Sequence, residues 1–245
     1  NGDLAHRLVV VTAGGTHEPI DPVRFVGNRS SGKMGYALAI EARDRGAHVI
    51  LISGPVALDV PYGVELRTVE TAMQMRDAVL SAITDADALV MSAAVADFRP
   101  ETPAAQKLKK GSGGGETQGF DFDAQGGFTL HLVRNPDILG ELAGVSESSN
   151  GQTTDNGKPG KRLVRVGFAA ETNDIVANAQ SKLVAKHLDL LVANDVSRLD
   201  SGFGTETNKV IIFHATGVME DLPIMPKAGV AAAIWDQVVP LLSTI

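Results

Sequence analysis

Short apolar runs that alternate with helical stretches constrain the fold of this chain more than any other feature of its sequence. Strands are predicted at residues 7–12, 48–53, 65–69 and 88–91. Between them, residues 34–43 have helical spacing and stop before Gly46, and a second helix opens on Thr71 with Gln74 placed to complete a capping box. This alternation predicts an α/β fold with a doubly wound, mostly parallel Rossmann-like sheet, in which strand ends meet at one ligand-binding rim.

The second half of the chain continues the alternation and adds one antiparallel element. Residues 120–122 and 128–132 alternate in polarity around Gly126 and Gly127, which predicts a hairpin. Two stretches, 111–119 and 146–160, are so rich in glycine and polar residues that we expect mobile loops. Further strands are predicted at 163–168, 188–192 and 209–213, and further helices at 175–186 and 230–242. We expect one domain over residues 1–245.

Composition excludes several classes of function. The 245 residues are 44% hydrophobic, enough for a sizeable core, and the net charge of −7 provides no basic field for nucleic acid or an anionic membrane. The absence of cysteine removes disulfides, thiolate catalysis and zinc–thiolate sites. We expect a soluble, cytoplasmic protein, because no apolar run reaches the length of a membrane span and no signal peptide opens the chain. The start at Asn1 suggests a processed product or a piece of a longer polypeptide.

Residues 27–35 (GNRSSGKMG) form the clearest candidate binding loop, because small and amide-bearing residues run directly into a predicted helix. Gly27 and Gly32 permit unusual backbone conformations, and the free N–H groups of a first helical turn bind anions. The motif is close to that of a P-loop, G-x-x-x-x-G-K-[ST], but Met34 stands where a Mg²⁺-binding hydroxyl is needed. In addition, residues 21–26 contain a proline and too few apolar residues for the buried strand that precedes a P-loop. A phosphate or carboxylate is the predicted occupant, and a P-loop NTPase is disfavoured.

Four predicted strand ends carry polar or turn-forming residues, at 12–21, 91–98, 167–172 and 192–196. Each alone would be an ordinary turn, but together they predict a ligand site at the rim of the sheet. The small residues after the 88–91 strand let a flat ligand approach the backbone, and Asp97 can meet a hydroxyl or a metal ion. A dinucleotide is disfavoured, since no G-x-G-x-x-G follows the first strand and no acidic residue ends the second.

Basic residues suited to a triphosphate are Lys107, Lys109 and Lys110 beside the first glycine-rich stretch, and Lys182 and Lys186 on one helix face. The alternative is an ordinary solvated charge run.

Two further polar residues can be explained by structural roles. Asn135 can act as the N-cap of a helix whose first residue is Pro136. His17 is interpreted as a hydrogen-bonded turn residue, because no second histidine stands at metal-ligand spacing.

Seven stretches, in order along nearly the whole chain, resemble bacterial phosphopantothenoylcysteine synthetase. They are 13–24 (AGGTHEPIDPVR), 27–35, 92–97 (SAAVAD), 107–110 (KLKK), 135–138 (NPDI), 167–172 (GFAAET) and 193–196 (ANDV). The resemblance implies a role in coenzyme A biosynthesis: CTP activates the carboxylate of 4′-phosphopantothenate as an acyl-cytidylate, and L-cysteine then displaces CMP. It also implies a homodimer with the hairpin as interface, and fusion to an upstream flavin-dependent decarboxylase.

The resemblance assigns residues to this reaction. Nucleotide contacts fall, by resemblance, on Ala93, Ala94, Val95, Asp97, Lys107, Asn135, Pro136, Asp137, Ile138, Phe168, Lys182 and Lys186, and Mg²⁺ would travel with the triphosphate. The phosphopantothenate end would be received by Gly27, Asn28, Arg29, Ser30, Ser31, Gly32 and Lys33. Asn28 and Lys107 are the implied catalytic residues, Asn28 acting on the activated intermediate and Lys107 on the triphosphate. The 111–119 stretch would be a flap, and it and 146–160 are longer than the family pattern.

Two other functional classes stay open from the residues alone. A nucleotide-dependent oxidoreductase predicts tight NAD(P)H binding without pyrophosphate release. A non-catalytic nucleotide-binding domain predicts CTP binding without turnover.

Overall fold

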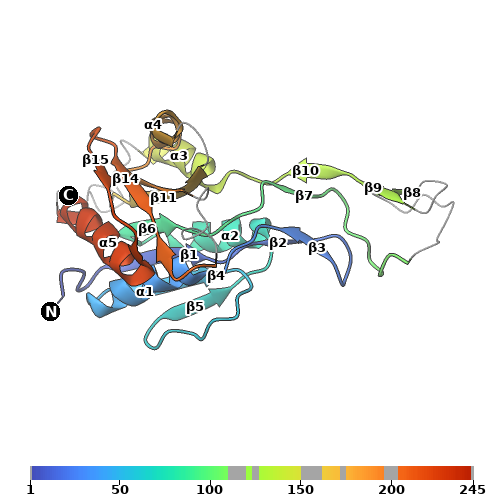
Figure 1. Cartoon of the computed structure of the whole chain (residues 1–245), viewed down its shortest axis with the longest axis horizontal. Helices are drawn as coiled ribbons and strands as arrows, with labels where there is room; N and C mark the ends of the chain where they lie inside the picture. Colours follow the sequence, from blue (N-terminus) through green and yellow to red (C-terminus); the bar gives the residue numbers. More distant parts are fainter. Residues whose placement is uncertain are drawn as a thin grey trace.

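The computed structural model describes residues 2–109, 120–122, 127–149, 162–171, 175–195 and 204–243. Its centre is a sheet in the order β15-β14-β12-β11-β6-β1-β4-β5 (Figure 1). The parallel strands are β1 (Leu8–Ala13), β4 (His48–Ser53), β5 (Glu65–Thr68), β6 (Ala88–Met91), β11 (Val164–Glu171) and β12 (Leu190–Asp195). Two antiparallel strands, β14 (Val210–His214) and β15 (Met219–Asp221), extend one edge. The parallel strands follow the 3-2-1-4-5-6 order of doubly wound folds, so the predicted fold class is confirmed.

The central strand shows why apolar runs without alternation were a reliable signal. In β1, Val10 pairs with Ile50 of β4 on one side and with Leu89 of β6 on the other. Val9 and Val11 face one helical layer while Val10 faces the opposite one, and all three are fully buried. A strand covered on both faces needs apolar residues at every position, as this sequence provides.

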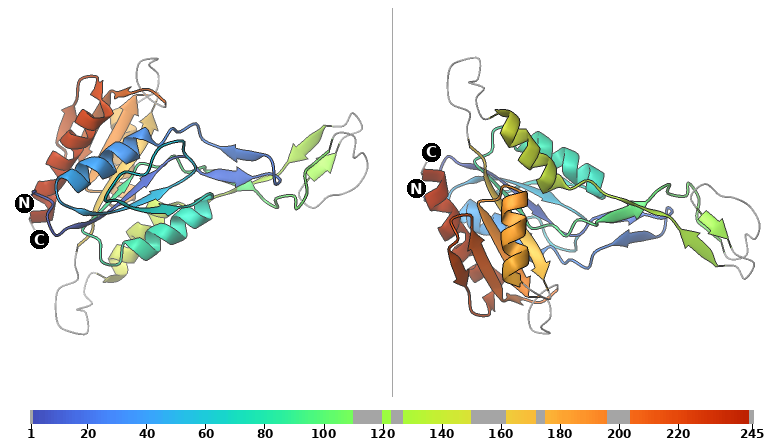
Figure 2. Two further views of the ribbon diagram at one scale, coloured as in Figure 1. Left: turned by 90° about the horizontal axis from the view of Figure 1, so that it is seen from below. Right: turned by 90° about the horizontal axis from the view of Figure 1, so that it is seen from above.

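The helices lie in two layers, one on each face of the sheet (Figure 2). One layer holds α1 (Lys33–Asp44) and α5 (Lys227–Ser243), joined where the buried Trp235 donates its Nε1–H to the carbonyl of Leu38 at 3.0 Å. The other holds α2 (Ala72–Ala82), α3 (Ile138–Ser149) and α4 (Ile175–Ala185). Within the described ranges, no helix has the length and hydropathy needed to cross a membrane.

Most predicted helix and strand boundaries hold within a few residues. Thr71 caps α2 through the predicted capping box, and Gly46 follows α1 with a φ of 93°. The predicted hairpin is present as β8 (Phe120–Phe122) paired with β9 (Phe128–Leu130). Other boundaries were wrong: β11, β12 and α5 are each three residues longer at one end, and residues 146–149, predicted as loop, belong to α3. Residues 111–119 and 150–160 lie outside the described residues.

An arm extends away from the sheet (Figures 1 and 2), and most of its strands were not predicted from the sequence. It consists of the described residues between 17 and 27 and between 98 and 134. Its strand pairs are β2 (His17–Pro19) with β3 (Phe25–Gly27), β7 (Phe98–Pro100) with β10 (Leu132–Arg134), and β8 with β9. A separate short pair, β13 (Thr207–Asn208) with β16 (Met225–Pro226), precedes α5.

Candidate functional site

A cavity of about 660 Å³ lies at the carboxyl ends of β6, β11 and β12. The strand order reverses between β1 and β6, so the cavity lies beside the switch point where open α/β sheets bind ligands. Its volume is within the range found for small-molecule sites. The N-terminal end of α1, the segment after β6, the start of α3, Lys182 of α4 and Lys186 directly after α4 also line it.

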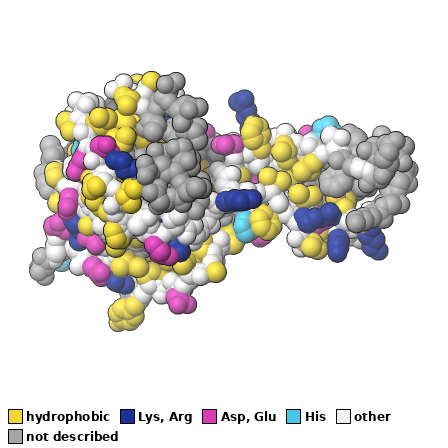
Figure 3. Space-filling view, in the orientation of Figure 1, with side chains coloured by type: hydrophobic (Ala, Val, Ile, Leu, Met, Phe, Trp, Pro, Cys, Tyr) yellow, Lys and Arg dark blue, Asp and Glu magenta, His cyan; other side chains and the backbone are white. Residues whose placement is uncertain are grey.

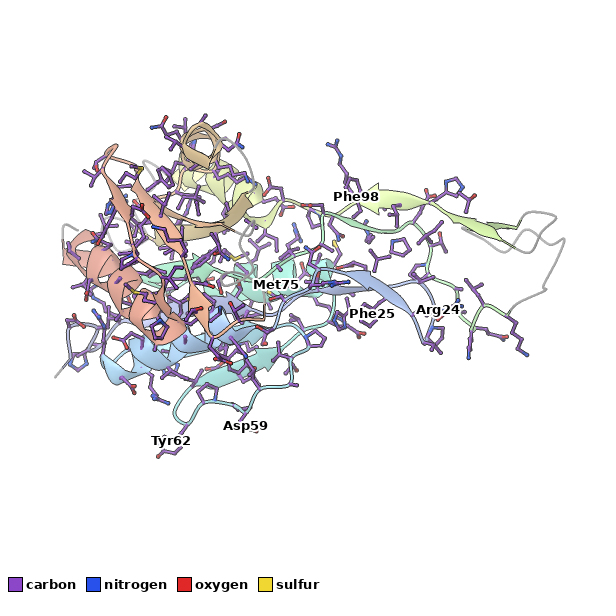
Figure 4. All side chains as sticks on the ribbon, viewed as in Figure 1. Arg24, Phe25, Asp59, Tyr62, Met75 and Phe98 are labelled. Atoms are coloured by element: carbon purple, nitrogen blue, oxygen red, sulfur yellow. The ribbon has the colours of Figure 1, made fainter. Side chains whose placement is uncertain are left out.

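Most of the predicted site residues line this one cavity. They are Asn28, Ser30, Ser31, Gly32, Lys33, Ala93, Ala94, Val95, Asp97, Asn135, Pro136, Asp137, Ile138, Phe168, Lys182 and Lys186. Three predicted residues, Gly27, Arg29 and Lys107, are not among its lining residues. Lys107 is exposed on the arm, where the neighbouring Leu108 bonds to Asp21 and Arg24. Figure 4 shows Arg24 out on this arm.

The small residues after β6 are held from behind by the end of β1. The buried Thr12 and Thr16 accept hydrogen bonds from the N–H groups of Ala93 at 3.1 Å and Ala96 at 2.9 Å. The N–H of Ala94 donates to the carbonyl of Gly14 at 2.8 Å. None of residues 12–21 is among the lining residues, and in the described structure Thr12, Gly14 and Thr16 support the wall of the cavity. Of the N–H groups at 93–96, the one on Val95 makes no hydrogen bond within the described part of the chain.

Asn28 joins the loop before α1 to this wall. Its Nδ2 donates to the carbonyl of Val95 at 3.0 Å and approaches the carbonyl of Ala94 at 3.4 Å. The second distance is long for a hydrogen bond, so that N–H can turn to a better acceptor at little cost. The side chain is exposed and lines the cavity, which lets it serve both the loop and a ligand.

The start of α3 corrects the predicted cap. Asp137, not Asn135, is the N-cap, because its Oδ1 accepts from the N–H of Gly140 at 3.1 Å and its carbonyl accepts from Glu141 at 2.9 Å. The Nδ2 of Asn135 instead donates to the carbonyl of Ala96 at 2.8 Å. Asn135 therefore holds the cavity wall in place. Residue preferences at helix N-caps could not predict that role.

An ion pair at one end of the cavity joins the N-cap of α3 to the residue directly after α4. The ammonium of Lys186 lies 2.6 and 2.5 Å from the two carboxylate oxygens of Asp137. Burial would raise the pKa of Asp137, but the bonds from Lys186 and from the Gly140 N–H outweigh it and lower that pKa. Lys186 thus carries a counter-ion, and Lys182 adds a second cation to the same wall.

Five polar residues of the cavity were not among the predicted site residues: Ser92, Arg134, Asn194, Asn208 and Lys227. The Oδ1 of Asn194 is buried without a hydrogen-bond partner in the described structure, so it is an acceptor for a ligand N–H or O–H. Asn194 stands in a predicted strand end, a signal that could have found it. Lys227 lay before the predicted start of its helix, and Asn208 preceded an apolar run, so neither stood out.

A pre-formed metal centre is not evident in the described residues, where no three His, Cys, Asp or Glu side chains gather. The interpretation of His17 as a turn residue was wrong, because it begins strand β2, and its ring stacks on Phe25 with centroids 3.7 Å apart. Asp97 is a carboxylate on the cavity wall.

A doubly wound sheet with a polar cavity at its switch point defines the chain as a Rossmann-like ligand-binding protein. Residues 4–241 match the family described as the DNA/pantothenate metabolism flavoprotein C-terminal domain. The chain belongs to that family, and the resemblance drawn from its motifs is confirmed.

Similar proteins include the coenzyme A biosynthesis bifunctional protein CoaBC of Bacillus subtilis (47% identical) and of Mycobacterium bovis (44% identical). The matches cover 97% and 98% of this chain but 52% and 54% of those proteins, so the chain spans about half the length of the relatives it matches. The crystal structure of a CoaBC C-terminal domain is 33% identical over the whole of both chains, with a TM-score of 0.76. A Cab2 mutant in complex with phosphopantothenate-cysteine, 15% identical with a TM-score of 0.70 over 97% of this chain and 87% of that one, shares the fold.

Proposed function

We propose that this chain is a phosphopantothenate–cysteine ligase domain that acts with CTP in coenzyme A biosynthesis. The observation that carries the proposal is one cavity, which gathers residues of five of the seven family motifs at the switch point of the sheet. The name of the relatives, coenzyme A biosynthesis bifunctional protein, supports the pathway. The fold shared with a protein that binds phosphopantothenate-cysteine is consistent with the product.

The first half-reaction would activate a carboxylate. A carboxylate oxygen of 4′-phosphopantothenate attacks the α-phosphorus of CTP, the bond from that phosphorus to the bridging oxygen breaks, and pyrophosphate leaves. The product is an acyl-cytidylate, a mixed anhydride with a good leaving group. The protein has chiefly to align the two anionic substrates and to neutralise their charge, which Lys182, Lys186 and Lys33 support from the cavity wall.

Mg²⁺ would arrive with the triphosphate, since this ion is usually held by one or two carboxylates together with substrate phosphates. The residues present fit this mode: Asp97 lies on the cavity wall, and Asp137 faces the same space although it is paired with Lys186. When bound, the ion would neutralise phosphate charge.

The second half-reaction would form the amide. The amine of L-cysteine attacks the acyl carbon, the bond to the CMP oxygen breaks, and the amine gives up a proton. Asn28 has no titratable proton, so it can only orient the acyl group or stabilise oxygen charge. Its weakly engaged second N–H supports this assignment.

The arm suggests how Lys107 would reach a site. We propose that two copies pair through their arms, so that Lys107 of each serves the cavity of the other. Exposed apolar side chains lie along this arm: Val23 is 60% and Leu132 45% exposed. Figure 3 shows hydrophobic side chains gathered on the arm, and Figure 4 shows Phe25 and Phe98 there. Lys107 does not line the cavity of its own chain, so a second copy would complete the site.

Because the chain spans about half of its relatives, we also propose that a flavin-dependent decarboxylase precedes it in the full protein. That enzyme would act on the ligase product.

Pyrophosphate release tests the proposal. The chain, with Mg²⁺, 4′-phosphopantothenate and CTP, should release pyrophosphate, and addition of L-cysteine should yield the amide and CMP. ATP should support the reaction far less well, because a cavity wall closed around a pyrimidine leaves less room for a purine. CTP binding without turnover would favour a non-catalytic domain, and NAD(P)H binding without pyrophosphate release would favour an oxidoreductase.

A further inference from the structure

One end of the cavity joins Lys33, from the motif 27–35, to a buried lysine, Lys227, that lies outside the family motifs. We propose that Lys227 and Lys33, supported by Asn208, form a binding site for a phosphate group of a substrate. The inference rests on the proposed function in one respect, namely which substrate brings the phosphate. The site itself follows from geometry, burial and charge.

Lys227 is held in a fixed position at the wall of the cavity. It is 7% exposed, and its ammonium donates to the side-chain oxygen of Asn208 at 2.8 Å and to the carbonyl of Thr207 at 3.1 Å. Asn208 is 3% exposed and turns its Nδ2 to the sulfur of Met34 at 3.5 Å, which links the start of α5 to the start of α1. A lysine tied down in this way is a pre-organised cation rather than a solvated one.

At this end of the cavity, positive charges lie at helix N-termini, where helices usually disfavour them. Lys33 is the first residue of α1 and Lys227 the first of α5, while neither helix has an acidic residue in its first turn. Helix N-termini favour anions and disfavour cations, so both starts carry the wrong charge for isolated helices. Gly32, the N-cap of α1, offers no side-chain cap either.

Part of the counter-charge at this end of the cavity comes from Glu206. Glu206 pairs with Lys33, but its side chain is 81% exposed, so solvent can replace it easily. Burial lowers the pKa of Lys227 to about 8, although Glu206 opposes this shift, and Lys33 adds to it. A cation that is costly in the free protein becomes favourable when an anion enters, which is the expected behaviour of a phosphate-binding lysine.

Two substrates of the proposed reaction carry phosphate: CTP, with its triphosphate, and 4′-phosphopantothenate. Both offer the same chemistry to Lys227, so the experiment must separate them. Binding of CTP, cytidine, 4′-phosphopantothenate, pantothenate and inorganic pyrophosphate would be measured by calorimetry on wild type, Lys227→Met and Lys33→Met. Lys209→Met serves as control, because this lysine pairs with Asp221 outside the cavity lining.

We expect Lys227→Met to weaken one phosphorylated ligand and pyrophosphate roughly 10- to 100-fold, the usual loss for a charge-assisted hydrogen bond. Cytidine and pantothenate should bind as before, and Lys209→Met should change nothing. Loss of CTP affinity assigns the triphosphate, and loss of 4′-phosphopantothenate affinity assigns the phosphate of that substrate.

Lys33→Met keeps the proposal testable if Lys227→Met does not fold, because the Lys33 side chain is 30% exposed and tolerates replacement more readily. Unchanged affinity for all phosphorylated ligands in a folded variant would overturn the proposal. Lysine-dependent pyrophosphate binding in a protein that binds neither CTP nor 4′-phosphopantothenate would support this site and reject the proposed function.

Discussion

Lys227 gives the cavity a group that titrates at mildly alkaline pH. Its pKa, lowered by burial to about 8, means that the lysine loses its proton at mildly alkaline pH in the free protein. The charged groups that act on it include Lys33 and Glu206, and the pair with Lys33 lowers the pKa of Glu206, which therefore stays ionised.

The first prediction follows from that pKa. An anion binds the charged form, so the affinity for pyrophosphate should fall as pH rises from 7 to 9, by up to about tenfold per unit above the pKa. The same titration on Lys227→Met should give a nearly flat profile. Calorimetry at several pH values measures both, and parallel profiles in the two proteins would contradict the assignment.

The second prediction concerns Asn28, whose side-chain amide already donates one N–H to the carbonyl of Val95. In Asn28→Asp, a carboxylate replaces the amide near the Ala94 carbonyl and cannot stabilise charge on an acyl oxygen. We expect aminolysis to slow by about 10²–10³-fold while pyrophosphate release continues, so that the acyl-cytidylate accumulates. Mass spectrometry of the quenched reaction detects the adduct. Normal amide formation would refute this role for Asn28.

At the scale of elements, the turn between β2 and β3 anchors the segment that carries Lys107. The buried Asp21 accepts from the N–H groups of Val23 at 2.8 Å, Arg24 at 2.9 Å and Leu108 at 3.1 Å. Arg24 bonds Asp21 and also donates to the carbonyl of Leu108 at 2.9 Å. The Arg24 guanidinium, helped by the backbone N–H groups, holds the pKa of Asp21 well below its usual range.

The third prediction separates anchoring from charge. Asp21→Asn should lower both Tm and ligase activity, because the anchor of the Lys107 segment is lost. Lys107→Gln should lower activity with an unchanged Tm, since this side chain is exposed. Asp21 also makes stability depend on pH. Because its pKa is lower in the folded than in the unfolded state, the ionised carboxylate stabilises the fold above about pH 4, and this stabilisation is lost as the pH falls further. Thermal melts from pH 6 to 3 should therefore show a steeper fall for wild type than for Asp21→Asn; equal slopes would count against the anchor.

The sequence predicted the elements whose formation depends on local burial, and it missed short strands without a local signal. The core strands were found because burial on both faces demands continuous apolar residues, as in Val9, Val10 and Val11. Of the strands of the arm, β2, β3 and β7 were missed because they are three residues long and include Pro19 and Pro100, and β7 pairs with residues distant in sequence. Short strands of that kind have no local signal.

The site divides in the same way. Residues after β6 and before α1 were predicted, since glycine, alanine and amide residues at strand ends mark ligand contact. The cap of α3 was misplaced because Asn135 and Asp137 have similar local preferences, and only the tertiary bond from Asn135 to Ala96 decides between them. Lys227 was missed because its burial depends on packing between α1 and α5.

For the whole molecule, the arm makes the oligomeric state part of the catalytic account. The fourth prediction is that the chain has a solution mass near twice its 25.6 kDa, and that Val23→Glu combined with Leu132→Glu yields monomers. Light scattering after gel filtration measures this. Tyr62→Glu is the control, because Tyr62 is 92% exposed on the loop between β4 and β5, away from the arm (Figure 4). A monomeric wild type would exclude pairing.

Mixing two inactive variants tests whether Lys107 acts on the partner. A dimer of Lys107→Gln with Asn28→Ala has one intact site if Lys107 crosses between copies, and none if it acts within its own chain. Random exchange should then restore about a quarter of the wild-type activity, because half of the dimers are mixed and each has one of two sites intact. No recovery, with exchange shown by tagged chains, would place Lys107 on its own cavity.

The central claim is that this cavity activates a carboxylate with CTP, and isotope exchange tests that step directly. With Mg²⁺ and no cysteine, labelled pyrophosphate should enter CTP only when 4′-phosphopantothenate is present, because the acyl-cytidylate forms reversibly. Asn28→Asp should keep this exchange and lose amide formation, whereas Lys107→Gln should lose both. Amide formation by the wild type without any substrate-dependent exchange, or exchange that needs no 4′-phosphopantothenate, would contradict the account.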